Sequence, residues 1–128
     1  MINKEKDNLK DLFRMRRQFM SLLEDQKPGS YPEWPLDISK KESQQILRDT
    51  ALKGVEEMFE ALQHLKNWKP HRSTDIPTFD REEFLEEVVD AFNYFLSVLV
   101  LVGVDENEFY TSYKQKDKII RERLNSGY

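Results

Sequence analysis

The chain has 128 residues, no cysteine, and a formal net charge of −4 from 20 basic and 24 acidic side chains. This length suggests a single domain over residues 1–128 with a modest core. The lack of cysteine excludes a disulfide framework, thiolate metal sites and a cysteine nucleophile. The acidic balance argues against general attraction to nucleic acid or to an anionic membrane. No signal-peptide pattern opens the chain, and its longest apolar run is too short to cross a bilayer, so we expect a cytoplasmic protein.

Four segments carry apolar residues at helical intervals, and proline-containing linkers or a glycine separate them. Capping patterns, in which an acidic residue follows three positions after a serine or an aspartate, begin the last three segments at Ser39, Asp80 and Asp105. Gly54 weakens the second predicted helix by about 1 kcal/mol relative to alanine. The predicted helices span residues 4–25, 39–68, 80–102 and 105–126. No stretch alternates long enough to predict a strand, so we expect an all-α bundle of four to five helices.

Two acidic pairs stand thirty residues apart on the second and third predicted helices. They are Glu57 with Glu60, and Glu87 with Asp90. Residues three apart on a helix lie on one face, so each pair aims two carboxylates in nearly one direction. Four such carboxylates on facing helices would repel one another strongly unless a hard cation such as Mg²⁺ lay between them. The spacing therefore predicts a metal site that acts on a phosphorylated substrate.

The third predicted helix gives the stronger of the two signals. Its carboxylate face becomes apolar one turn after Asp90, and the opposite side is apolar throughout. A helix that is apolar all round is expected to be buried all round, and buried carboxylates need a positive partner. For Glu57 and Glu60 an ordinary solvated helix face stays an open alternative, because such pairs are common on surface helices.

Four passages of the chain carry further motifs. They are Gln18 in the first predicted helix, Glu57-Met58-Phe59-Glu60 with Leu65-Lys66-Asn67-Trp68-Lys69 behind it, Glu87-Val88-Val89-Asp90, and a basic tail that ends Arg123-Leu124-Asn125-Ser126-Gly127-Tyr128. In their order these passages resemble the all-α nucleoside triphosphate pyrophosphohydrolases, a superfamily that includes the MazG-like enzymes. Within it the chain is most similar to the dimeric-type dUTPases and dCTPases, including phage forms. The tail departs from the dUTPase pattern at Asp117 and Ile120, where asparagine is usual.

The resemblance implies cleavage of a deoxynucleoside triphosphate between its α- and β-phosphates, with dUTP the first candidate and dCTP the second. The products would be the monophosphate and pyrophosphate. In the family a glutamate of the first motif typically activates water, so Glu57 is the predicted base, with Glu56 and Glu86 as competitors. The predicted ligands of Mg²⁺, or of Mn²⁺ as a substitute, are Glu57, Glu60, Glu87 and Asp90.

Contacts to the nucleotide are predicted from residues outside the acidic pairs. Lys116 and Arg123 share a helix face and are candidates for binding phosphate, although basic residues near a helix C-terminus also simply complement its dipole. Further phosphate candidates are Lys69 and Tyr128. The candidates for base and sugar are Gln18, Trp34, Asn93 and Tyr94, and for each of them an ordinary structural role stays open.

Two further expectations concern assembly and alternative functions. The third helix is too apolar for a small monomer, so we expect a homodimer or homotetramer, and family members commonly complete the base pocket with a second subunit. If the chain is viral, as the resemblance to phage forms implies, we expect it in the host cytoplasm. A broad-specificity MazG-like pyrophosphatase is one alternative function. A catalytically silent helical dimerisation module is the other.

Overall fold

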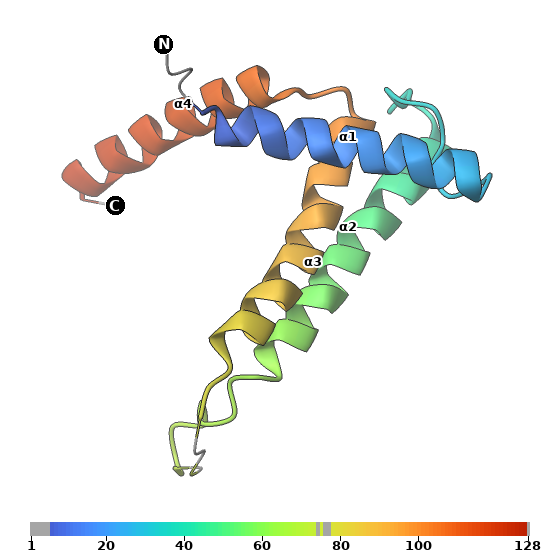
Figure 1. Ribbon diagram of the computed structural model, residues 1–128. Helices are drawn as coiled ribbons and strands as arrows, with labels where there is room; N and C mark the ends of the chain where they lie inside the picture. Colours follow the sequence, from blue (N-terminus) through green and yellow to red (C-terminus); the bar gives the residue numbers. More distant parts are fainter. Residues whose placement is uncertain (1–5, 74, 76–77, 128) are drawn as a thin grey trace, which may run out of the picture. The chain divides into compact units, whose positions relative to one another are not determined.

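The computed structural model describes residues 6–73, 75 and 78–127, and these residues form four α-helices and no strand (Figure 1). The all-α prediction is therefore confirmed. No single helix in the described ranges is long and apolar enough to cross a membrane. In chain order the helices are α1 (Asn8–Gln26), α2 (Lys41–Leu62), α3 (Arg81–Leu101) and α4 (Glu106–Asn125).

Aspartate side chains cap the starts of three helices. The Asp80 carboxylate accepts the amide of Glu83 at 3.0 Å, and the Asp105 carboxylate accepts the amide of Glu108 at 2.9 Å. These bonds satisfy backbone N–H groups that have no partner within the helix, as the capping patterns predicted. Asp7 does the same for α1, whose predicted start at residue 4 lies outside the described residues.

The predicted cap of α2 is wrong. The residue that caps this helix is Lys40, and it makes no side-chain cap bond. The Ser39 hydroxyl instead donates to the Asp37 carboxylate at 2.6 Å, and the Ser39 amide donates to the same oxygen at 3.1 Å. Serine and aspartate form such local turns readily, and the turn takes Ser39 away from the helix end.

The observed end of α2 differs most from its prediction. The helix ends at Leu62, whereas the periodicity predicted helix to residue 68. The amides of His64 and Leu65 bond to carbonyls three residues back, at 3.1 and 3.0 Å, which tightens the last turn and stops the helix. The end of α3 is close to its prediction. Gly103 has a φ of +78°, and the amide of Val104 bonds to the carbonyl of Leu99 at 3.0 Å, as in a Schellman motif.

The described chain divides into two compact units, of which one comprises residues 36–98. In this unit α2 and most of α3 form an antiparallel pair (Figure 1). The helices approach closely at Gly54, where an added Cβ would lie 2.6 Å from the Phe95 ring. Ala61 and Ala91 are fully buried. The glycine that lowers helix propensity is therefore what lets this pair approach so closely.

The other unit comprises residues 1–35 and 99–128 and contains α1 and α4. Phe13 is fully buried and packs against Phe109 with ring centroids 6.2 Å apart. Arg17 forms an ion pair with Glu106 at 3.3 Å, and the buried Arg16 donates to the Tyr31 hydroxyl at 3.0 Å. Apolar, ionic and hydrogen-bonded contacts between distant segments thus hold this unit together.

The expectation that α3 is buried all round is wrong for the single chain. Leu85 is 55% exposed, Val89 50% and Phe92 54%. The side of α3 that packs on α2 is covered, whereas the side that carries these residues faces solvent. The predicted metal-binding acids of α3 are not buried either: Glu87 is half-buried and Asp90 is exposed.

Candidate metal centre

Three of the four predicted ligands converge in the unit formed by α2 and α3. Glu57 from α2, and Glu87 with Asp90 from α3, each offer a carboxylate oxygen, and these oxygens lie within 4.8 Å of one another. Glu87 and Asp90 share a face because they are three residues apart on α3. Glu57 lies three residues after Gly54, where the two helices approach closely. The close approach of the backbones thus brings the carboxylates of both helices together.

The fourth predicted ligand, Glu60, lies beside this cluster rather than within it. Glu60 is exposed, and its carboxyl group is hydrogen-bonded to that of Glu57. The arrangement is therefore three converging carboxylates with a fourth paired to Glu57. The structure brings three of the four predicted ligands together, and their binding of a metal ion stays a prediction.

The electrostatic state of Glu57 reflects this crowding. Desolvation raises the pKa of its carboxyl above the ordinary value, and the charge of Glu60 and the hydrogen bond to it raise the pKa further. The charges of Asp90 and Glu87 act in the same direction. Like charges at short range disfavour the ionised form, so Glu57 retains its proton more readily than an isolated glutamate.

The donor set fits a hard divalent cation. All the converging ligand atoms are carboxylate oxygens, which suit Mg²⁺ and Mn²⁺. Mg²⁺ usually keeps several waters and takes only a few protein carboxylates, and the exposure of Asp90 leaves room for water or phosphate oxygens. A cation here would offset the repulsion that raises the pKa of Glu57.

The two competing candidates for the base, Glu56 and Glu86, are exposed and lie outside the converging group. Each is next in sequence to a converging carboxylate, and adjacent helical residues point about 100° apart. The structure therefore places Glu57, and neither competitor, among the acids of the cluster.

Two predicted nucleotide contacts share α3 with the cluster. Asn93 follows Asp90 by three residues and Tyr94 follows it by four, so both lie on the same side of the helix one turn further on. Both side chains are half-buried. The structure thus brings these two residues close to the carboxylates along one helix face.

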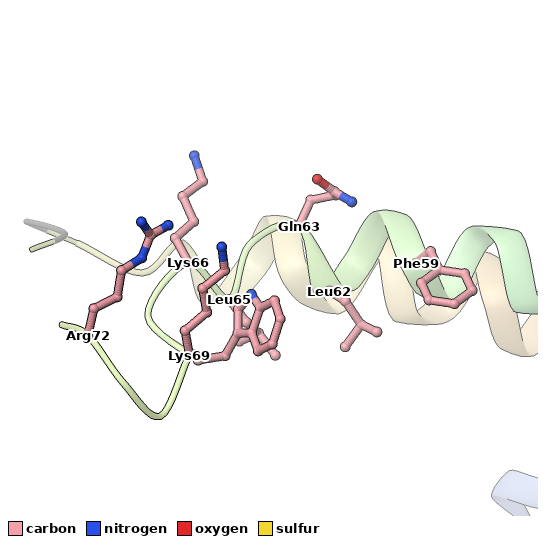
Figure 2. A pocket seen from close by; sticks show the side chains of 8 residues that line it. Phe59, Leu62, Gln63, Leu65, Lys66, Lys69 and Arg72 are labelled. Carbon is pink, nitrogen blue, oxygen red and sulfur yellow. The ribbon is translucent and has the colours of Figure 1, made fainter. Parts of the chain in front are cut away.

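Lys69 lies in an open pocket of about 730 Å³ that follows α2 (Figure 2). Two further cations, Lys66 and Arg72, line it, and the Lys69 ammonium lies 5.8 Å from the Trp68 ring centroid. Lys66 was predicted only as part of the motif around Trp68, without a role, and Arg72 was not predicted as a site residue. A signal for them was present, since basic residues recur at every third position around a tryptophan. The pocket is lined by Phe59, Leu62, Gln63, Leu65, Lys66, Trp68, Lys69 and Arg72.

The remaining predicted contacts lie in the other unit. Gln18 is exposed on α1 and accepts a bond from Arg14 at 3.5 Å. Lys116 and Arg123 are exposed on α4, and Trp34 is half-buried in the segment after α1. Tyr128 lies outside the described residues. The acidic cluster and these four described residues therefore belong to separate compact units.

Comparison of the chain with models of protein families, with curated proteins and with solved structures found no match. The residues and their geometry are therefore the basis for a functional proposal. The resemblance to the all-α pyrophosphohydrolases stays a prediction from sequence motifs.

Proposed function

We propose that the protein is a Mg²⁺-dependent hydrolase of deoxynucleoside triphosphates, with dUTP as the first candidate substrate and dCTP as the second. The products are the monophosphate and pyrophosphate. The observation that carries this proposal is the convergence of Glu57, Glu87 and Asp90 from two helices, with oxygens within 4.8 Å of one another. Carboxylates held this close by a helix pair bind a divalent cation well, and such a cation suits triphosphate substrates.

Each acid has a separate task in this proposal. Glu87 and Asp90 bind the metal ion from one face of α3, and Glu57 completes the group from α2. Bound Mg²⁺ supplies charge neutralisation at the phosphate oxygens. Glu57 also orients the attacking water and accepts its proton, as the predicted base among the converging acids. Water attacks one of the two phosphorus atoms that the α–β bridging oxygen joins, the bond from that phosphorus to the bridging oxygen breaks, and the monophosphate and pyrophosphate leave.

The other predicted contacts take the rest of the nucleotide. Asn93 and Tyr94 continue the carboxylate face of α3 and are proposed to contact sugar or base. Lys69 is proposed for phosphate binding, and so are Lys116 and Arg123 of α4. Gln18 and Trp34 are proposed for the base, whose identity depends on few contacts.

The test is a panel of canonical nucleoside and deoxynucleoside triphosphates with dUTP added, assayed for pyrophosphate release with Mg²⁺ and with EDTA. We expect Mg²⁺-dependent release of pyrophosphate that is fastest with dUTP or dCTP. Similar rates across the panel would instead favour a broad-specificity MazG-like pyrophosphatase. Release of orthophosphate alone would contradict cleavage between the α- and β-phosphates.

A protein that releases nothing needs a second measurement. Thermal unfolding with Mg²⁺ and a nonhydrolysable dUTP analogue distinguishes an enzyme with a different substrate from a silent helical module. A binding protein is stabilised by RT ln(1 + [L]/Kd), which is about 2.7 kcal/mol at a hundredfold excess over Kd. No response to the metal, the nucleotide or both together would support the silent module.

A further inference from the structure

The end of α2 and the segment that follows it carry two interleaved series of side chains. Apolar residues recur at every third position from Phe59 to Trp68, and basic residues recur at every third position from Lys66 to Arg72. No acidic residue interrupts residues 61–73, although the compact unit of residues 36–98 carries more acidic than basic side chains. The segment is therefore a local patch of positive charge and apolar surface within an acidic unit.

The two series line opposite sides of the pocket that follows α2. The charged ends of Lys66, Lys69 and Arg72 point to one side in Figure 2. Phe59 and Leu62 point to the other side (Figure 2). The pocket thus has a cationic side and an apolar side, and a molecule that fills it must offer both negative charge and apolar surface.

The side chains around the pocket are widely open to solvent. Trp68 is 69% exposed, Phe59 60% and Leu65 40%. A site for a small molecule encloses most of its ligand, whereas an extended segment of another protein lies along an open groove. Tryptophan and arginine are also the residues that most often carry the binding energy of protein interfaces, and the pocket has one of each in Trp68 and Arg72. Its openness and its composition therefore favour a protein segment as the occupant.

The cations of the pocket are available to such a segment. None of the ion pairs among the described residues includes Lys66, Lys69 or Arg72. Lys66 and Arg72 are exposed, and Lys69 is held near the ring of Trp68. Arginine can bind a carboxylate through two parallel hydrogen bonds, and lysine attracts it as a point charge. Charge complementarity therefore indicates a segment that is rich in aspartate or glutamate.

Aromatic and basic side chains in one groove also suit single-stranded nucleic acid. The charge of the surrounding unit disfavours that occupant. A nucleic acid carries a negative charge at every nucleotide, and the unit that contains the pocket is acidic, with Glu82 and Glu83 in the first turn of α3. A peptide can confine its acids to the part that contacts the three cations, so it avoids this repulsion.

We propose that this pocket binds an acidic peptide segment of another protein. An aromatic or leucine side chain of the segment packs on Trp68 and Phe59, and its carboxylates pair with Lys66 and Arg72. The interaction uses none of the converging acids and needs neither metal nor nucleotide, so it does not rest on the proposed hydrolase activity. Lys69 is also proposed to bind phosphate, and for this reason the charge is tested at Lys66 and Arg72.

The test selects peptides that bind the full chain from a displayed library of random sequences, in EDTA and without nucleotide. The expected peptides combine several acids with a leucine or an aromatic residue. A selected peptide is then labelled with fluorescein, and its dissociation constant is measured by fluorescence anisotropy. Trp68→Ala, Lys66→Glu and Arg72→Glu should each raise this constant at least about tenfold, as changes at central interface positions commonly do.

Matched controls make the same kinds of change outside the pocket. Lys41→Glu reverses an exposed charge at the first residue of α2, and Leu52→Ala shortens a side chain of α2 that is 44% exposed. Both variants should bind the peptide as the wild-type chain does. Circular dichroism of every variant checks that the helix content is unchanged, which the exposure of the substituted side chains leads us to expect.

The proposal has three results that would overturn it. The first is a selection that yields no acidic peptide. The second is an acidic peptide whose dissociation constant is the same for the wild-type chain, Lys66→Glu and Trp68→Ala, because it then binds elsewhere. The third comes from labelled oligothymidylate as a second probe: if it binds through Trp68 and no acidic peptide does, the pocket serves a nucleic acid. Since substrate is absent throughout, these results are independent of whether the chain hydrolyses nucleotides.

Discussion

Two glutamates show how differently the two compact units treat a carboxylate. Glu24, at the end of α1, accepts the amides of Gly29 and Tyr31, each at 2.8 Å. These bonds hold the pKa of Glu24 below its ordinary value. Glu57 has other carboxylates as neighbours. Desolvation raises its pKa most, and the charges of these neighbours raise it further. The first acid completes a turn, whereas the second lies in a cluster that a cation would stabilise.

The contrast separates structural acids from candidate functional acids. Backbone N–H groups satisfy Glu24 and fix the path of the chain after α1, so its role is complete without a ligand. The cluster of Glu57, Glu87 and Asp90 concentrates like charges, which costs stability. A bound cation would offset this cost, and this is the physical argument for the proposed metal.

The largest expected effect comes from removing one charge of the cluster. Glu87→Gln should lower the rate of pyrophosphate release at least about a hundredfold, since loss of one electrostatic contact to the reacting group commonly costs that much. The same variant should be more stable than the wild-type chain in EDTA, because it removes repulsion, and it should lose the stabilisation by Mg²⁺. Activity and thermal unfolding measure the two effects.

The control is Glu86→Gln, which removes the neighbouring exposed acid and should keep both activity and the response to Mg²⁺. Full activity of Glu87→Gln would refute the metal centre. Equal loss in both variants would indicate a general effect of charge rather than a site.

A smaller effect is expected where the two helices approach. Gly54→Ala improves helix propensity by about 1 kcal/mol, but its Cβ would lie 2.6 Å from the Phe95 ring. Overpacking commonly costs about 1–3 kcal/mol, so the net change should be destabilising and should weaken the response to Mg²⁺ by separating the carboxylates. Chemical denaturation measures the free energy of unfolding.

The matched test adds Phe95→Leu, which removes the ring that Gly54→Ala would contact. The double variant should then show favourable coupling relative to the sum of the single changes. Simple additivity would mean that the contact between Gly54 and Phe95 does not control the spacing of the helices.

These variants also mark what the sequence could predict. The pairing of Glu87 with Asp90 follows from local helix geometry, and so do the caps at Asp80 and Asp105, which the structure confirms. The position of Glu60 beside the cluster depends on how α2 is rotated against α3. That rotation is set by tertiary contacts such as Gly54 with Phe95, which sequence periodicity does not contain.

Two of the failed predictions have a similar origin. The stop of α2 at Leu62 rests on a tightened last turn, and the apolar periodicity that continued to Trp68 gave no sign of it. The exposure of Val89 and its neighbours was missed because an apolar helix predicts burial without saying what provides it. The single chain covers one side of α3 and leaves the other side exposed.

A weaker effect is expected in the dependence of stability on pH. The pKa of Glu57 is raised in the folded protein, so the folded state binds its proton more tightly than the unfolded state does. The stabilisation that comes from this tighter proton binding is present at low pH. It is lost as the pH rises above the ordinary pKa of glutamate. In EDTA, Glu57→Gln should therefore flatten the decline in stability above about pH 4.5. Chemical unfolding at a series of pH values measures this decline in stability. If Glu57→Gln left the decline unchanged, the crowding of acids around Glu57 would be contradicted.

The smallest effect is the opposite response at Glu24. Its pKa is lowered in the folded protein by the amides of Tyr31 and Gly29, so the unfolded state binds the proton more tightly. The contribution is therefore present above the ordinary glutamate pKa and is lost as the pH falls below it. Glu24→Gln should reduce the loss of stability on acidification and leave the response to Mg²⁺ unchanged. Asp25→Asn, which removes an exposed charge at the neighbouring position, is the control for a general effect of charge. If Glu24→Gln and Glu57→Gln changed the pH dependence of stability in the same direction, the opposite pKa shifts of the two carboxylates would be contradicted.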